Sequence, residues 1–151
     1  MNVELLTFPN KRLRRKASKV EHFNIDLVRA SLPKMRRIMR QNNGAALASI
    51  QVGLLWSFFI VDDPINGCDV LLNPSWLPTK TSSLLMGKEG CLSFPGLQLN
   101  IMRHSEIYGV WYDLEMNKHE ATLAGFPARV FQHETEHLSG VVFINKVVDL
   151  T

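Results

Sequence analysis

Apolar and polar residues recur along the chain with two different periods, and the longest regular stretch has the period of a helix. Between residues 26 and 41, apolar side chains return every three or four positions while arginines occupy much of the remaining surface. The apolar positions are Val28, Leu32, Met35 and Met39. This spacing gathers them on one side of an α-helix. The sequence therefore predicts a helix over 26–41 that buries one face and ends at Asn42-Asn43-Gly44.

Most of the remaining chain has shorter apolar runs, bounded by turn residues, which are typical of β-strands. Strands are predicted at residues 57–61, 70–72, 98–102, 106–112 and 120–123, with a last short strand at 141–143. Residues 78–90 are polar and contain Gly and Ser, so they are predicted to form a loop. No repeat or linker divides the chain. We therefore expect a single catalytic domain over residues 1–151, of the α+β class, with antiparallel-rich sheets wrapped around a central helix.

The central helix is predicted from the segment QHETEHL (residues 132–138), which contains the HExxH pattern of two histidines and a glutamate. In a helix, His133 and His137 lie one turn apart on the same side, where two imidazoles can bind one metal ion. Glu134 projects beside them, free to act as a base toward water that the ion activates. Pro127 is placed to open this helix and Gly140 to end it. A chance HExxH has a probability of roughly 1% in this chain, so a metal site is favoured over two histidines without metal.

A catalytic site with two histidines needs a third protein ligand and one position open to water. Downstream of His137 only Asp149 is a candidate, and it lies close to the end of the chain, where segments fray. The upstream candidates are Cys91, His104, His119 and Cys68. Cys91 is favoured, because its Gly-containing loop lets the backbone approach an ion closely and because a thiolate is a strong ligand.

Composition narrows the class of protein. The hydrophobic fraction of 46% and the charged fraction of 21% are those of an ordinary globular protein, which argues against disorder. No apolar run approaches the length of a membrane-spanning helix, and the N-terminus lacks the regions of a signal peptide. The two cysteines are too few for a disulfide framework. We therefore expect a cytoplasmic protein with reduced thiols and no membrane contact.

Basic residues are concentrated near the N-terminus. Six of the nine residues at 11–19 are Lys or Arg, although the net charge of the whole chain is only +3. A solvated basic surface is favoured over a nucleic-acid contact, because no aromatic residues are interleaved with the charges. Contact with the ribosome through this segment stays open as a hypothesis, whereas direct DNA binding is not expected.

Three segments together resemble the peptide deformylase family, whose members remove the formyl group from the N-terminal methionine of new polypeptides. Residues 44–51 (GAALASIQ), 89–93 (EGCLS) and 132–138 (QHETEHL) are similar to the family's three motifs in order and spacing. The resemblance covers nearly the whole chain. It implies the family's fold, a metal-dependent hydrolase activity and N-formylmethionyl peptides as substrate. We expect the protein to act as a monomer.

The resemblance also implies a role for individual residues. The metal ligands would be Cys91, His133 and His137, holding Fe²⁺ in the cell, with Zn²⁺, Ni²⁺ or Co²⁺ as substitutes. Glu134 would move a proton from water to the leaving amine, and the Gln51 amide with the Leu92 backbone N–H would bind the formyl oxygen. The residues expected at the substrate are Gly44, Ala46, Leu47, Glu89, Gly90, Phe126 and Val130. Of these, Leu47, Phe126 and Val130 would form the methionine pocket, and backbone near Gly44 and Gly90 would pair with the substrate main chain.

The chain departs from the family pattern at three positions. Ala46 and Ser49 stand where Gly and Ala are usual, and Glu136 stands where Asp is usual. The chain also lacks the C-terminal helical extension that many bacterial members carry. In this respect it is similar to the short forms encoded by phages. Two alternatives stay open. One is a metal-dependent amidase or peptidase that acts on another short acyl-peptide, and the other is a catalytically weak, ribosome-associated basic module with a structural metal.

Overall fold

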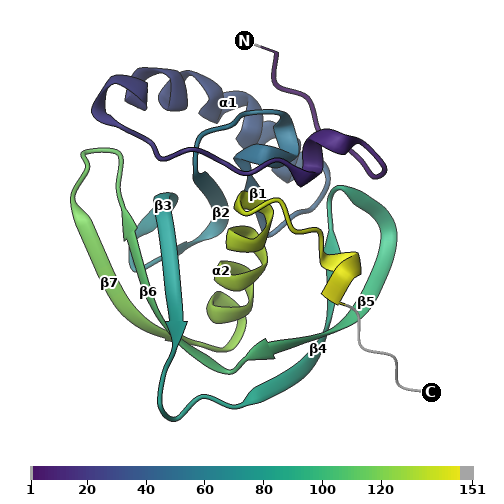
Figure 1. Ribbon diagram of the computed structural model, residues 1–151. Helices are drawn as coiled ribbons and strands as arrows, with labels where there is room; N and C mark the ends of the chain where they lie inside the picture. The colour runs from purple at the N-terminus through teal and green to yellow at the C-terminus, as the bar shows by residue number, and fades with distance from the viewer. Residues whose placement is uncertain (1, 147–151) are drawn as a thin grey trace.

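The computed structural model describes residues 2–146, which fold into two sheets around a central helix (Figure 1). The helices are η1 (Lys11–Arg14), η2 (His22–Asn24), α1 (Ile25–Gln41), η3 (Ser49–Val52), α2 (Gly125–Leu138) and η4 (Phe143–Lys146). The strands are β1 (Ala46–Ala48), β2 (Phe58–Ile65), β3 (Cys68–Pro78), β4 (Leu84–Cys91), β5 (Phe94–His104), β6 (Glu106–Tyr112) and β7 (Lys118–Ala124). Within the described range, no helix is both long and apolar enough to cross a membrane.

The strands form two antiparallel sheets of unequal size. β1, β2, β3, β6 and β7 make a five-stranded sheet in that order, and β4 pairs with β5 in a separate two-stranded sheet. α2 lies between the sheets in Figure 1 and contacts strands of both. The predicted α+β arrangement around a central helix is therefore confirmed.

The apolar core lies on both faces of the five-stranded sheet, because side chains along a strand alternate between faces. On β2, Phe58 and Ile60 belong to the cluster that includes the apolar stripe of α1. The intervening Phe59 belongs to a second cluster, together with Phe131 of α2 and Trp111 of β6. The larger sheet is thus covered by α1 on one face and by α2 on the other, and this second cluster fixes the position of α2.

Most predicted elements are confirmed, including the helix over 26–41, but two predictions are wrong. The predicted loop at 78–90 contains strand β4, whose polar and glycine residues pair with β5 and are mostly solvent-exposed or partly exposed. An apolar period could not reveal a strand that buries so little. The predicted strand at 141–143 is absent: the Val141 N–H instead donates to the Glu136 carbonyl at 2.9 Å and helps to end α2, where Gly140 has a φ of 78°.

Candidate active site

The two histidines of α2 face the same point, as their spacing predicts. The Nε2 atoms of His133 and His137 lie 3.2 Å apart, and their ring centroids are 4.9 Å apart. The Nδ1 atom of His133 is 2.8 Å from a carboxylate oxygen of Glu89, so this nitrogen carries the proton of that hydrogen bond. The Nε2 atom is then left as a lone-pair donor for an ion.

Cys91 supplies a third donor at the end of β4, where the pairing with β5 shifts register. Its Sγ atom lies 3.3 Å from Nε2 of His137. Tetrahedral ligands with bonds of about 2.0–2.3 Å are roughly 3.3–3.7 Å from one another, which is close to these separations. The three donor atoms lie within 4.8 Å of one another, and no other such group of His, Cys, Asp or Glu occurs in residues 2–146. The residues therefore fit a divalent metal ion.

The other candidates for the third ligand lie elsewhere. The ring of His104 packs against Trp76, with centroids 5.5 Å apart. Cys68 contacts His119 at 3.7 Å on a different part of the molecule, and Asp149 is outside the described residues. The geometry thus favours Cys91 among the alternatives that the sequence left open.

A buried network of charges orients His133. Arg103 donates two hydrogen bonds, of 2.8 and 2.9 Å, to the carboxylate of Glu89 and also pairs with Glu136. Arg129 adds a third hydrogen bond to Glu89, at 3.0 Å. Burial by itself would raise the pKa of Glu89, but the hydrogen bonds from Arg103 and His133 lower it to about 2. Glu89 therefore stays ionised and holds His133 in place.

The electrostatic environment of the two rings differs. Burial lowers the pKa of His137 well below its usual 6.5, so that ring is neutral, as a ligand imidazole must be. For His133, burial works in the same direction, but hydrogen bonds to Cys91 and Glu89 outweigh it and raise the pKa to about 10. The same negative groups that favour a proton on His133 also favour a metal cation beside it.

Glu134 is a buried carboxyl beside the ligands. Only 3% of this residue is exposed, and its Oε2 atom has no hydrogen-bond partner among the described residues. Burial raises the pKa of Glu134 to about 7. A carboxyl with this pKa can both accept and return a proton near neutral pH.

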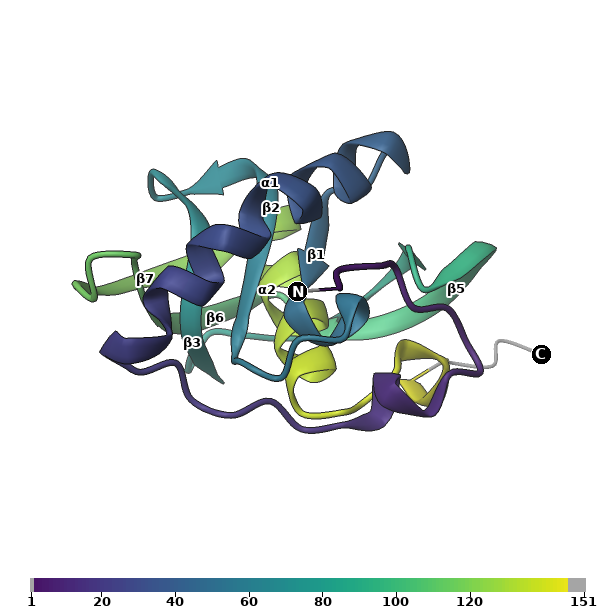
Figure 2. The same ribbon diagram turned by 90° about the horizontal axis from the view of Figure 1, so that it is seen from above.

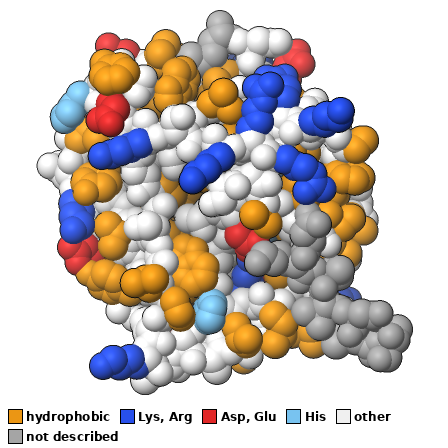
Figure 3. All heavy atoms as spheres, viewed as in Figure 1, with side chains coloured by type: hydrophobic (Ala, Val, Ile, Leu, Met, Phe, Trp, Pro, Cys, Tyr) orange, Lys and Arg blue, Asp and Glu red, His pale blue; other side chains and the backbone are white. Residues whose placement is uncertain are grey.

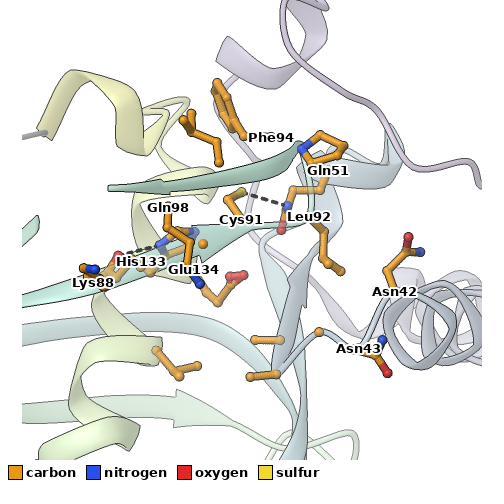
Figure 4. Close-up of a pocket in the computed structure, with 18 of the residues that line it drawn as sticks. Asn42, Asn43, Gln51, Lys88, Cys91, Leu92, Phe94, Gln98, His133 and Glu134 are labelled. Atoms are coloured by element: carbon orange, nitrogen blue, oxygen red, sulfur yellow. Dashed lines mark hydrogen bonds and ion pairs between the residues drawn. The ribbon is translucent and has the colours of Figure 1, made fainter. Parts of the chain in front are cut away.

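Gln51 directs an amide toward the same place from η3 (Figure 4). Its Oε1 atom accepts the Ala48 backbone N–H at 2.9 Å, and its Nε2 atom lies 3.5 Å from Sγ of Cys91. The side chain is only 1% exposed, so its position is fixed by its neighbours. A hydrogen-bond donor is therefore present next to the metal ligands.

These groups open onto a cleft of about 790 Å³. The cleft is lined by residues 42–46 after α1, by the end of β4 and the start of β5, and by residues of α2 between Phe126 and Glu134. At Gly44, a Cβ atom would come within 2.6 Å of the Cδ1 atom of Leu92, so a larger residue there would require the Leu92 side chain to move. Phe126 and Val130 form an apolar part of the lining.

Comparison with known proteins agrees with this geometry. The family model for Polypeptide deformylase matches residues 3–151. The chain belongs to the polypeptide deformylase family. The peptide deformylase of Bifidobacterium adolescentis is 40% identical over 127 residues, which cover 74% of this chain and 57% of that protein. The peptide deformylase of Thermotoga neapolitana is 34% identical over 135 residues, which cover 89% of this chain and 80% of that protein.

Solved structures of the family have the same fold. The crystal structure of the peptide deformylase from Thermotoga maritima is similar, with a TM-score of 0.87 and 30% identity, and covers 99% of both chains. The chain spans less than two thirds of the length of the Bifidobacterium relative but nearly all of the Thermotoga maritima structure. The resemblance drawn from the three segments is thus confirmed at the level of family and fold.

The structure brings the residues named from the deformylase motifs to one cleft, with two exceptions. His137 lies behind its wall at 1% exposure, as a buried ligand can. Leu47 is fully buried in the cluster around α1 and does not line the cleft. Glu89 does line it, but both carboxylate oxygens are bonded to protein groups. The three positions that depart from the family pattern have different surroundings. Ala46 lines the cleft, the Ser49 hydroxyl donates to the Trp56 carbonyl, and Glu136 pairs with Arg103.

Sequence reasoning missed the two arginines of the buried network. Arg103 is 4% exposed, and it follows the predicted strand 98–102 at a position that alternation with Ile101 places inward. A charged residue at an inward position of a strand is a signal that could have been noticed. Arg129 gave no comparable signal, because a basic residue on a helix is usually solvated.

Proposed function

We propose that the chain is a metal-dependent hydrolase that removes the N-formyl group from the initiator methionine of nascent polypeptides. The observation that carries this proposal is the convergence of three donor atoms, a buried carboxyl and an amide donor at one cleft. A formamide carbonyl needs an activated water, a group that moves protons and a donor for its oxygen. All three requirements have a candidate residue here.

A divalent ion held by Cys91, His133 and His137 supplies, when bound, a Lewis acid that lowers the pKa of water. One thiolate and two imidazoles suit Fe²⁺, Co²⁺, Ni²⁺ and Zn²⁺. We propose Fe²⁺ as the physiological metal, with the other three as substitutes. Elemental analysis of protein purified without oxygen tests this, and a chain that carries only zinc under those conditions would contradict it.

Glu134 is the group proposed to move the proton. It lies on α2 between the two histidines in sequence, and it lines the cleft. We propose that its carboxylate takes a proton from water and returns it to the amine of the leaving methionine. Its unpartnered Oε2 atom supports this role, because no protein group competes for the carboxylate oxygen.

Gln51 and the backbone N–H of Leu92 are proposed to bind the formyl oxygen as negative charge develops on it. The Gln51 amide nitrogen already lies close to Cys91. We propose that the substrate lies in the cleft as an added strand, beside Gly44, Ala46 and Gly90. Its methionine side chain would contact the apolar surface of Phe126 and Val130.

An assay of formate release tests the proposed reaction directly. The metal-loaded chain should release formate from formyl-Met-Ala-Ser and should not hydrolyse the acetylated or the free peptide. Formyl is the smallest acyl group, and an acetyl group adds a methyl for which a formyl site needs no space. Equal hydrolysis of the acetylated peptide would favour the amidase or peptidase alternative. A chain that unfolds when its metal is removed, and that releases no formate when loaded, would favour a structural metal.

The basic segment at residues 11–19 is proposed to recruit the protein to ribosomes. All six of its Lys and Arg residues are exposed. Figure 3, viewed from the same side as Figure 1, shows several Lys and Arg side chains over the upper half of the molecule. Ribosomal RNA is a polyanion, and such contacts weaken with salt. Reversal of charge at Arg12, Arg14 and Arg15 should reduce cosedimentation with ribosomes. The control, with the same net charge, reverses Arg29, Lys34 and Arg37 of α1, and equal losses from both variants would contradict a localised contact.

We further propose that the protein acts as a single-domain monomer in the cytoplasm, where formylated nascent chains emerge. The monomer is supported by the cleft itself, since every proposed ligand and catalytic group comes from one chain. Light scattering coupled to gel filtration should give a mass near 17.2 kDa. A stable dimer with the cleft at its interface would contradict this proposal.

A further inference from the structure

Ser93 is a buried residue next to the active site for which the proposed reaction has no use. It lies in the turn between β4 and β5, and its exposed fraction is 0%. Its hydroxyl lies 3.1 Å from Nε2 of Gln51, which donates the hydrogen bond. The contact joins two segments that are 42 residues apart in the sequence. A buried hydroxyl that accepts from a reacting side chain can set the direction of that side chain.

The hydrogen bonds of the Gln51 amide account for its orientation. Its oxygen must face the Ala48 N–H, because a backbone amide can only donate, and this excludes the flipped side chain. One of the two amide protons then goes to Ser93. The second proton is left to point at Cys91 and hence toward the reacting carbonyl. Ala48 and Ser93 therefore fix the amide, and its second N–H faces the metal ligand Cys91.

The N-terminal arm holds both partners at the required separation. The Leu6 N–H donates to the Gln51 carbonyl at 2.7 Å, and the Phe8 N–H donates to the Ser93 carbonyl at 2.8 Å. Figure 2 shows this purple segment passing beside the hairpin of β4 and β5, near the start of β5. The ring of Phe8 also stacks on Phe94, with centroids 5.0 Å apart. The arm thus links η3 to the turn that carries Ser93, so the two side chains meet in a fixed register.

We infer that Ser93 is a positioning residue for Gln51, and that its hydroxyl directs the other amide N–H of Gln51, the one that faces Cys91, at the oxygen of the scissile group. This inference rests on the proposed deformylase reaction. Ser93 does not touch the substrate or the metal in this scheme. Its contribution is to keep a donor aimed at charge that develops only in the transition state, so its loss should lower kcat more than it changes KM.

Kinetics of Ser93→Ala test the inference. We expect kcat for formyl-Met-Ala-Ser to fall by about 10- to 100-fold, with KM within about 2-fold and metal content unchanged. The matched control is Ser31→Ala, which removes a buried hydroxyl that bonds the Val28 carbonyl in α1, away from the cleft. This control should keep the parent kcat. Should Ser93→Ala fail to fold, Ser93→Cys gives the same comparison, because a thiol fills the space but is a weak acceptor.

A double-mutant cycle separates positioning from general structural loss. In a Gln51→Ala background, Ser93→Ala should change kcat by less than about 2-fold, because its effect acts through the missing amide. An unchanged kcat in the single variant, or an equal fall in both backgrounds, would overturn the inference. A parent chain that releases no formate would instead refute the proposed function and leave the contact without a catalytic meaning.

Discussion

The two sides of α2 are stabilised in opposite ways. On the side facing the five-stranded sheet, Phe131 makes edge contacts with Phe59 and Trp111, at centroid distances of 5.6 and 5.9 Å, and all three rings are fully buried. On the opposite side, His133 is hydrogen-bonded to Glu89 of β4, and the buried carboxyl of Glu134 lies near the charges of Arg103 and Glu89. Burial of the first side is favourable by itself, whereas burial of the second is costly unless each group is paired or binds an ion.

This contrast assigns separate tasks to the two sides. Apolar contacts are non-directional, so they can place the helix without needing particular partner atoms. The polar side depends on direction, since His133 needs the carboxylate of Glu89 and Glu89 needs two arginines. Changes on the apolar side should therefore reduce stability, while changes on the polar side should reduce catalysis or metal binding. Four substitutions measure this division.

The largest expected effect on stability is that of Phe131→Ala. Removal of a fully buried aromatic ring typically costs about 3–5 kcal/mol of folding free energy, partly through the cavity that remains. The midpoint of urea unfolding should fall accordingly, while the folded fraction keeps its kcat. The control is Phe23→Ala, because Phe23 is 80% exposed and its loss should change little. A loss of less than about 1 kcal/mol would be as small as that of a surface substitution. It would show that the apolar side does not hold α2 in place.

Glu134→Ala should have the converse effect. We expect kcat/KM to fall by about 10²-fold or more, about 2.7 kcal/mol of barrier, because the proton-transfer group is gone. Metal content should be retained, and the unfolding midpoint should be unchanged or raised, since a buried unpartnered carboxyl is removed. The comparison variant Glu120→Ala changes an exposed carboxylate on β7. Full activity of Glu134→Ala would refute its proposed role.

Glu89→Gln should lower the metal affinity of the site without unfolding the protein. Loss of a partner that orients a ligand histidine typically costs about 10- to 100-fold in metal affinity. The oxygen of glutamine can still accept from Nδ1 of His133, but its NH2 group cannot accept from Arg103 or Arg129, so the measured loss reports the charge together with these arginine hydrogen bonds. Competition with a chelator gives the affinity. Glu106→Gln is the control, because Glu106 bonds Thr79 and Thr81 away from the cleft, and a similar loss there would point to a general charge effect.

The smallest effect is expected at a surface ion pair. Arg36 of α1 lies 3.1 Å from Asp69 of β3, and both side chains are substantially exposed. Arg36→Ala should cost no more than about 1 kcal/mol, because water and salt screen such pairs. Unfolding at low and high salt measures it, and the cost should shrink as salt rises. A loss as large as that of Phe131→Ala would break the comparison between apolar and polar contacts.

Sequence reasoning succeeded where one face of an element is apolar. The helix over 26–41 and the strand at 106–112 agree closely with α1 and β6, because each buries a regular set of side chains. It failed for β4, whose residues Leu84–Cys91 are held by backbone pairing and lie largely at the surface. Hydrophobic periodicity therefore predicts the elements of the covered five-stranded sheet, but not the largely exposed strand β4.

The site was predictable only in part for a related reason. HExxH fixes its own geometry, since one helical turn brings His133 and His137 to the same point. Cys91 could be ranked but not placed, because 42 residues separate it from His133 and no local rule spans that distance. Arg103 was missed although its inward position on a strand was a signal, and Arg129 gave no signal, because a basic residue on a helix is usually solvated.

By itself, the sequence determined the central helix with its two histidines and one carboxylate, and the strands that bury apolar residues, because these depend on neighbours within a turn or along a strand. Only the tertiary structure decided the rest. It brought Cys91 to the histidines, buried Glu89 between two arginines, left Leu47 outside the cleft and joined Gln51 to Ser93. Each of these contacts joins segments that are distant in the chain, and so depends on how the two sheets close around α2.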